Sequence, residues 1–166
     1  IIVQHPAGYN NVIIARAYND AIARNWTEIP FGMECQEAVT QPAAQVHNIP
    51  NTIKRIVIPV GSGMSLAGLL TGLQRSGYTI PVLGVIVGAE PHKRLMQYAP
   101  MFTWQNMVTF VRADNGGALR TAYHIPATNV MLGQLRLDSY YEAKCLPYLR
   151  TGDLLWVVGI RASETT

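Results

Sequence analysis

Charged side chains are scarce in this sequence. Asp, Glu, Lys and Arg together make up 14% of the 166 residues, whereas an average soluble domain has about 25%. The 13 basic residues exceed the 10 acidic ones, but they are scattered singly along the chain. The densest basic cluster, Lys93 with Arg94, is too short to suggest a nucleic-acid-binding patch. We therefore expect no nucleic-acid partner.

Cysteine is also rare, and no metal-binding spacing is present. The two cysteines, Cys35 and Cys145, lie far apart without a CxxC pair, so neither a disulfide framework nor a zinc site is indicated. A reducing cytoplasm fits this composition best. The histidines occur singly, without HxH or HExxH spacing, and metal binding is not expected. They are His5, His47, His92 and His124.

Long hydrophobic runs are absent as well. No stretch approaches the roughly 18 uncharged residues of a membrane span, and the first residues lack a basic segment followed by an apolar one. The sequence predicts a soluble, unexported protein. The chain opens IIVQHP without a methionine and in strand-like character, which favours a missing upstream portion.

What the sequence does contain is the composition of a globular domain. Hydrophobic residues make up 49%, and 14 glycines and 10 prolines mark frequent turns. The length suits about one domain with a genuine core. Towards the beginning, the pattern predicts a helix over 10–24 with Val12 and Ile22 on its apolar face, and a short strand over 26–32. A second helix is expected over 34–47, kinked or interrupted at Pro42.

Further along, near-continuous β-branched runs alternate with helical patterns. Such runs are typical of strands buried on both faces of a parallel sheet. The sequence therefore predicts one α/β domain over residues 1–166, with an open, mostly parallel sheet and helices on both faces. The expected strands are residues 53–60, a segment within 81–91, 107–111 and 154–160. The expected helices are 65–74, one that begins at about Pro91, and 138–153. Residues 112–137 are expected to form a long loop that serves as a lid.

A glycine-rich turn follows the first buried strand. Its glycines, Gly61 and Gly63, allow the backbone to approach a ligand closely. The helix that begins there presents unpaired N–H groups, and Ser62 and Ser65 add hydroxyls, so a phosphate is the expected ligand. The turn matches neither a Walker A loop nor the dinucleotide pattern GxGxxG, because its third glycine, Gly68, comes too late. An ordinary tight turn is the alternative interpretation.

Three stretches together resemble one family. The strand, glycine turn and helix of VIPVGSGMSLAGL (57–69), followed by PVLGVIVGAEP (81–91), are similar to the fold-type-II pyridoxal-phosphate enzymes. IPFG (29–32) resembles the Ile-Pro-Xaa-Gly of the aminocyclopropane-carboxylate deaminase and D-cysteine desulfhydrase branch. DSYYEAK (138–144) resembles the Asp-Pro-Val-Tyr-Glu-Gly-Lys of the same branch.

The resemblance implies a cofactor, a substrate class and a set of roles. Pyridoxal phosphate would be held by its phosphate at the turn, Glu142 would meet the pyridine nitrogen, and Tyr141 would face the substrate. The substrate would be a small amino acid, and the reaction a deamination, desulfhydration or related elimination. Relatives are usually dimers and have a second domain, so this chain would be part of a larger two-domain fold. The turn residues carried over are Gly61, Ser62, Gly63, Met64 and Ser65.

One feature of the family is missing. Its members bind the cofactor aldehyde through a lysine that precedes the glycine turn, and none of the three lysines here matches it. Lys54 begins the strand that ends at the turn, about 20 Å away from it. Lys144 lies two positions after Glu142, about 200° around an α-helix, and should point away from it. Lys93 has no assigned role in the family.

Three interpretations therefore remain open. The chain is a fragment of an enzyme whose lysine lies upstream or on another polypeptide, or it is a binding or scaffold module that has lost the lysine. A third interpretation is a nucleotide-binding domain that uses the turn for a pyrophosphate. For that, the nearest acidic residue, Glu90, lies 29 positions past Gly61 instead of about 20, which favours the first two.

Overall fold

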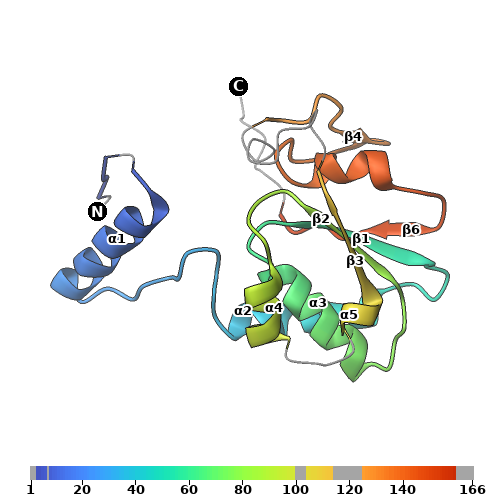
Figure 1. The fold of residues 1–166 in the computed structure, drawn as a ribbon, viewed down its shortest axis with the longest axis horizontal. Helices are drawn as coiled ribbons and strands as arrows, with labels where there is room; N and C mark the ends of the chain where they lie inside the picture. The colour runs from blue at the N-terminus through green and yellow to red at the C-terminus, as the bar shows by residue number, and fades with distance from the viewer. Residues whose placement is uncertain (1–2, 7, 100–103, 114–124, 160–166) are drawn as a thin grey trace. The chain divides into compact units, whose positions relative to one another are not determined.

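The computed structural model describes residues 3–6, 8–99, 104–113 and 125–159 (Figure 1). The chain divides into two compact units, residues 1–35 and 36–166, and each is described by itself. All the strands lie in the second unit. The expectation that residues 1–166 make one α/β domain stays a prediction.

The first unit is built on helix α1, Asn10–Arg24, which confirms the helix predicted at these residues. The helix ends at Asn25, which has the left-handed φ of 53°, and the Trp26 N–H donates to the Ala21 carbonyl at 2.8 Å. Ala21 is the buried residue of this helix, whereas Val12 and Ile22 are exposed.

The predicted strand over 26–32 is wrong. These residues form an irregular segment and then a turn, in which the Met33 N–H donates to the Pro30 carbonyl at 2.9 Å. Gly32 and Met33 both have positive φ, 71° and 55°, a conformation that no strand contains. Alternation alone predicted a strand here, but proline and glycine favour a turn.

The second unit contains a four-stranded sheet in the order β3-β2-β1-β6, in which every neighbouring pair is parallel (Figure 1). Its α/β class and parallel sheet were predicted correctly, although two further strands form a separate small antiparallel sheet. The strands of the main sheet are β1 (Arg55–Val60), β2 (Val82–Ile86), β3 (Val108–Arg112) and β6 (Asp153–Leu155).

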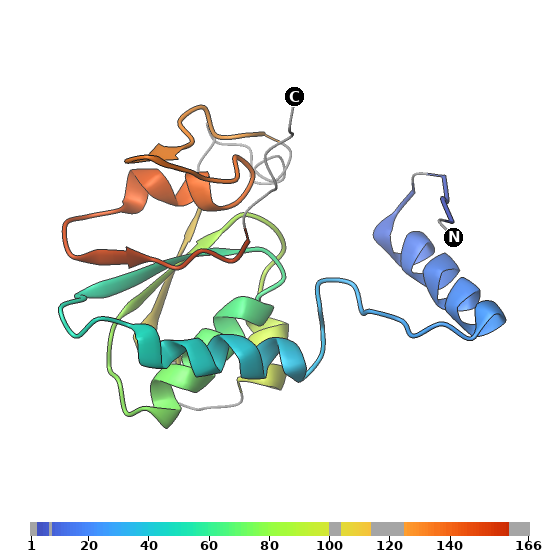
Figure 2. The same cartoon turned by 180° about the vertical axis from the view of Figure 1, so that it is seen from behind.

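Apolar cores lie on both faces of this sheet. Figure 2 shows helices on either side of it. Because side chains alternate along a strand, Ile56, Ile58 and Val60 join the core against the α-helices, while Val57 joins Val85 on the other face. The α-helical face is covered by α2 (Glu37–Gln45), α3 (Met64–Arg75), α4 (His92–Tyr98) and α5 (Trp104–Met107), and the other by the 3₁₀-helix η2 (Glu142–Tyr148).

Helices α2 and α3 approach each other at two glycines. A β-carbon at Gly72 would lie 2.5 Å from the Ala43 carbonyl oxygen, and one at Gly68 would lie 2.7 Å from that of Val39. Pro42 does not interrupt α2, against expectation, and its ring lies beside Gly68. After α2 the chain continues as a short 3₁₀-helix, Val46–Asn48.

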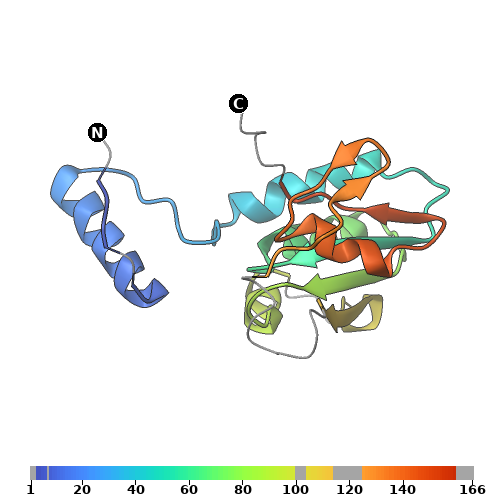
Figure 3. The same cartoon turned by 90° about the horizontal axis from the view of Figure 1, so that it is seen from above.

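The last third of the chain differs most from the prediction. The expected loop 112–137 contains a hairpin of β4 (Met131–Leu132) and β5 (Leu135–Arg136), drawn in orange in Figure 3. Its part 114–124 lies outside the described residues, as do the last residues of the chain. The expected helix 138–153 shrinks to η2, and the expected strand 154–160 shrinks to β6 at Asp153–Leu155.

Backbone chemistry explains this shortening. The Asp138 carboxylate accepts hydrogen bonds from the N–H groups of Tyr140 (2.7 Å) and Tyr141 (3.0 Å). These bonds form a turn that precedes the helix, and Pro147 lacks the N–H that would continue an α-helix.

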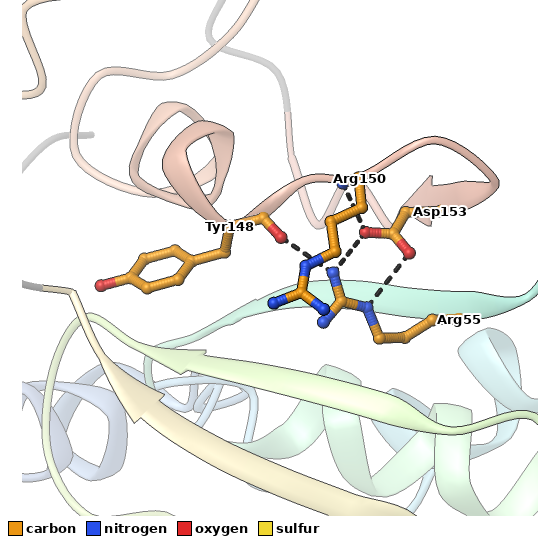
Figure 4. Close-up of polar contacts among 4 residues, drawn as sticks. All are labelled: Arg55, Tyr148, Arg150 and Asp153. Atoms are coloured by element: carbon orange, nitrogen blue, oxygen red, sulfur yellow. Dashed lines mark hydrogen bonds and ion pairs between the residues drawn. The ribbon is translucent and has the colours of Figure 1, made fainter.

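An ion pair fastens β6 to β1 at the amino ends of both strands (Figure 4). Arg55 donates to both carboxylate oxygens of Asp153, from Nε at 3.1 Å and from Nη2 at 2.5 Å. The same Nη2 donates to the Tyr148 carbonyl at 2.8 Å, and the Arg150 N–H donates to Asp153 at 2.8 Å. The Asp153 side chain is only 5% exposed, so this bidentate pair fixes the start of a three-residue strand.

Candidate functional site

The strand order defines where a ligand would bind. From β1 the chain passes through α3 to β2 and then to β3 on one side, whereas β6 lies on the other side of β1. The strand order therefore reverses between β1 and β6, and open α/β sheets bind ligands beyond the carboxyl ends of strands at such a switch point. The predicted glycine turn follows Val60, the last residue of β1, and so lies at this point.

The turn is packed tightly against the connection between β2 and α4. A β-carbon at Gly63 would lie 2.9 Å from Pro91 Cβ, and Gly63 has a φ of 93°, which favours glycine. A β-carbon at Gly88 would lie 3.5 Å from the α-carbon of Gly61. The glycine turn thus requires glycine for its backbone conformation and for its close packing against neighbouring residues.

Helix α3 begins at this turn with its N-terminus electrostatically positive. Gly63 is its N-cap and makes no side-chain cap hydrogen bond, and the first turn contains no acidic residue. Ser65 lies in the first turn and is half-buried, while the Met64 side chain is 3% exposed and belongs to the core. Met64 therefore contributes only its backbone to this edge. Its N–H is 3.5 Å from Ser62 Oγ.

Tyr141 lies directly against the glycine turn. A β-carbon at Gly61 would lie 2.8 Å from Tyr141 Cε1 and 3.0 Å from its hydroxyl oxygen. Tyr141 is half-buried and packs against the core of the η2 face. Two residues 80 positions apart, both predicted as site residues, are therefore in contact.

Glu142 is fully buried beside the end of β6. Its side chain is 1% exposed, and Oε1 accepts hydrogen bonds from the N–H groups of Val158 and Gly159, both at 3.1 Å. Its other oxygen, Oε2, is buried and has no hydrogen-bond partner among the residues that the structure describes. Burial raises the pKa of Glu142, and the backbone hydrogen bonds partly oppose this.

An unpartnered buried carboxylate oxygen costs free energy that a native structure rarely leaves uncompensated. Oε2 is therefore an acceptor for which the described residues supply no donor. Glu142 extends from η2, which packs against β1, the strand that ends in the glycine turn. The arrangement can hold an anion at the turn and a hydrogen-bond donor at Glu142.

The lysines occupy different places. Lys54 lies at the amino end of β1, where its side chain packs beside Gly152 and its N–H donates to the Gly152 carbonyl at 2.9 Å, so it is at the opposite edge of the sheet from the turn. Lys93 is exposed on α4. Lys144 is 4% exposed, and burial lowers its pKa. In a 3₁₀-helix it lies about 240° around the axis from Glu142, not the 200° of an α-helix.

Two further groups at the carboxyl edge of the sheet were not predicted as site residues. Arg94 donates from Nη1 to the Ser62 carbonyl at 3.4 Å, and the backbone of Val158 and Gly159 holds Glu142. In the sequence, Arg94 stands out only as part of a basic pair with Lys93. Its position three residues after Pro91, at the start of a helix whose side chains lean towards the N-terminus, was the available signal.

No protein family, curated protein or solved structure matches this chain. In the part of the chain that the structure describes, no helix is both long and apolar enough to cross a membrane. Within the same ranges, no group of three or more His, Cys, Asp or Glu side chains is arranged to hold a metal ion.

Proposed function

We propose that the carboxyl edge of this sheet binds pyridoxal phosphate and that the chain is the cofactor-binding portion of a cytoplasmic enzyme acting on a small amino acid. The reaction would be a deamination, desulfhydration or related elimination. The observation that carries the proposal is the buried Oε2 of Glu142, which has no hydrogen-bond partner among the described residues, combined with the N-terminus of α3 at the switch point, where the first turn contains no acidic residue.

The phosphate would lie at the turn. The backbone N–H groups of Gly63, Met64 and Ser65 begin α3 and have no intrahelical partner, and a dianion there is stabilised by the helix dipole. The hydroxyls of Ser62 and Ser65 would add hydrogen bonds.

Glu142 would bind the ring nitrogen. A protonated pyridine nitrogen is a cationic donor, which matches the unsatisfied Oε2 and would favour the ionised form of Glu142 against the effect of burial. The N–H groups of Val158 and Gly159 fix the orientation of the carboxylate.

The chemistry follows from these placements. When bound, pyridoxal phosphate withdraws electrons from the α-carbon of an amino acid substrate. Glu142 would strengthen this effect by keeping the proton on the ring nitrogen. Tyr141, whose hydroxyl lies over Gly61, would be placed to give or take a proton beside the substrate.

Ser65→Asp tests the phosphate end without disturbing the fold. A carboxylate at the second position of α3 complements the helix dipole and should leave the free energy of unfolding unchanged or slightly higher, yet it should repel a phosphate and weaken pyridoxal phosphate binding about tenfold or more. Binding is measured by titration with pyridoxal phosphate, with Ser65→Ala as the control. Equal affinities of Ser65→Asp and wild type would remove the turn as the phosphate site.

A second candidate function is a binding module without catalysis. It is favoured by the position of Lys54 at the opposite edge of the sheet and of Lys93 on the exposed surface of α4. Intact mass after incubation with pyridoxal phosphate and borohydride separates the candidates. An adduct mapped to a lysine upstream of this chain or on another polypeptide supports the enzyme, whereas reversible binding to the full-length gene product without an adduct supports the binding module.

A further inference from the structure

We propose that the amino edge of the sheet contains an anion-binding site, formed by Lys54, Arg55 and Arg150, for a phosphate group that is free or esterified. Strands β1 and β6 run parallel and begin at this edge, at Arg55 and Asp153. The glycine turn follows the other end of β1. The site is therefore separate from the proposed cofactor site and does not rest on the proposed function.

Arg55 is held in place but keeps unused hydrogen-bond donors. Its Nε and Nη2 donate to the two carboxylate oxygens of Asp153, and Nη2 also donates to the Tyr148 carbonyl (Figure 4). A guanidinium has five N–H groups, and those on Nη1 have no acceptor among the residues that the structure describes. The side chain is 21% exposed, so a further acceptor could bind to it without breaking the ion pair.

Arg150 brings a second guanidinium to the same place. It begins a turn over residues 150–153, which the Asp153 N–H closes by donating to the Arg150 carbonyl at 3.0 Å. In Figure 4 the Arg150 side chain points towards the guanidinium of Arg55. Hydrogen bonds from Arg55 lower the pKa of Asp153, and the charge of Arg150 adds to this effect. Yet the Arg150 side chain donates to no acceptor in the described part of the chain.

Lys54 adds a third positive charge beside the 150–153 turn. Its N–H donates to the Gly152 carbonyl at 2.9 Å. A β-carbon at Gly152 would lie 3.0 Å from Lys54 Cδ and 3.5 Å from Cε, so the aliphatic part of the lysine packs along the turn. The ammonium is one bond beyond Cε. It makes no ion pair with a described residue.

The charges of this cluster do not balance. Three cations lie around the single carboxylate of Asp153, and the adjoining residues 51–53 and 149–152 contain no acid. Two positive charges are left over, which a phosphate dianion would neutralise. Guanidinium groups match the oxygens of a phosphate with paired N–H bonds. Because only three side chains contribute, the cluster suits one phosphate group and not the extended backbone of a nucleic acid.

The test is a titration of the full chain, labelled with ¹⁵N, with inorganic phosphate at constant ionic strength and about pH 8, where phosphate is mainly a dianion. Backbone amide signals report each edge of the sheet separately. The amides of the 150–153 turn should shift with saturation, whereas acetate at the same ionic strength should give no saturating shift there. Glycerol phosphate, titrated in the same way, distinguishes the sources: tighter binding than inorganic phosphate supports an ester, and equal binding supports free phosphate.

Three variants test the named side chains. Arg150→Gln keeps the backbone N–H that bonds to Asp153 and should weaken phosphate binding at the 150–153 turn about tenfold, through the loss of a charged donor. Lys54→Gln should weaken it about threefold. The matched control is Arg136→Gln, which removes one positive charge from an exposed side chain of β5 and should leave the affinity within twofold. Melting curves verify that each variant is folded.

The outcomes separate this site from the glycine turn. Saturating shifts at the 150–153 turn that persist in Ser65→Asp and weaken in Arg150→Gln would support the proposal. Shifts confined to residues 61–65 would overturn it and leave the proposed function standing. Equal responses to phosphate and acetate, or equal losses in Arg150→Gln and Arg136→Gln, would reduce the cluster to a general effect of charge and would also overturn it.

Discussion

The phenol ring of Tyr141 lies so close to Gly61 that a β-carbon there would come within 2.8 Å of Cε1. Gly61 does not have a positive φ, so the backbone would accept alanine. The three atoms nearest to a β-carbon at Gly61 all belong to Tyr141. This contact joins the carboxyl end of β1 to η2 and sets the distance between the turn and the Tyr141 hydroxyl.

Gly61→Ala should therefore destabilise the protein by about 2 kcal/mol through overpacking and weaken pyridoxal phosphate binding. In a Tyr141→Ala background the same change should cost less than about 0.5 kcal/mol, because the added methyl group meets no ring. Denaturant unfolding of the four proteins of this cycle measures the coupling. Tyr141→Phe serves as a control, since it keeps the ring carbons and should not relieve the clash. Additive effects in the alanine cycle would contradict the contact.

The contact between α2 and α3 makes a second prediction. Gly72→Ala would normally favour a helix by about 1 kcal/mol, but here the methyl group would lie 2.5 Å from both the Ala43 carbonyl oxygen and Val46 Cγ2. We expect a net loss of about 2 kcal/mol in the free energy of unfolding. Gln74→Ala, exposed on the same helix, should change it by less than about 0.5 kcal/mol. A stabilised Gly72→Ala variant would show that the helices can separate without cost.

The sequence predicted those parts of the fold that depend on a regular apolar pattern. Strand β1 and helix α3 were recognised because Val57–Val60 is a continuous apolar run and Met64–Arg75 has helical periodicity. The parallel sheet followed from the alternation of strands and helices, whereas the order of its strands, and hence the switch point beside Gly61, was not predicted.

The sequence could not predict features that depend on tertiary contacts. The segment 26–32 alternates like a strand, yet no strand of the described chain pairs with it, and its proline and glycine form a turn instead. The length of η2 was overestimated because periodicity does not reveal that Asp138 binds the backbone of Tyr140 and Tyr141. Similarly, Gly68 and Gly72 were not recognised as the contact between α2 and α3, because only the packed structure brings Val39 beside Gly68 and Ala43 beside Gly72.

The ion pair of Arg55 and Asp153 predicts a dependence of stability on acid pH. The hydrogen bonds from Arg55 lower the pKa of Asp153 from its ordinary value of 3.8, so the pair stabilises the fold above that value. The stabilisation is lost as the pH falls through the lowered pKa. Asp153→Asn should cost about 2 kcal/mol at pH 7 and make the remaining stability less sensitive to acid below pH 4.

The control is the exposed pair of Arg112 and Glu90, whose side chains are 38% and 52% exposed. Glu90→Gln should cost less than about 1 kcal/mol, because solvent screens an exposed pair. Unfolding in denaturant across pH 2 to 7 compares the two variants. Equal costs at pH 7 would mean that burial of Asp153 contributes nothing to the strength of its pair.

Glu142 predicts the opposite dependence on pH. Burial raises its pKa above the ordinary value of 4.5, so below that value the carboxyl is protonated in both the folded and the unfolded state and carries no penalty. As the pH rises towards the raised pKa, the unfolded state ionises first and folding loses stability. The loss amounts to about 1.4 kcal/mol for each unit of difference between the two pKa values.

The free energy of unfolding of wild type, relative to Glu142→Gln, should therefore fall between pH 4 and pH 8. Glutamine keeps an oxygen for the N–H groups of Val158 and Gly159, so the variant should remain folded. A difference that is constant or rises with pH would contradict the raised pKa. Saturating pyridoxal phosphate should reduce the fall, because a pyridinium beside Oε2 favours the ionised carboxylate; a fall of unchanged size would place the ring nitrogen elsewhere.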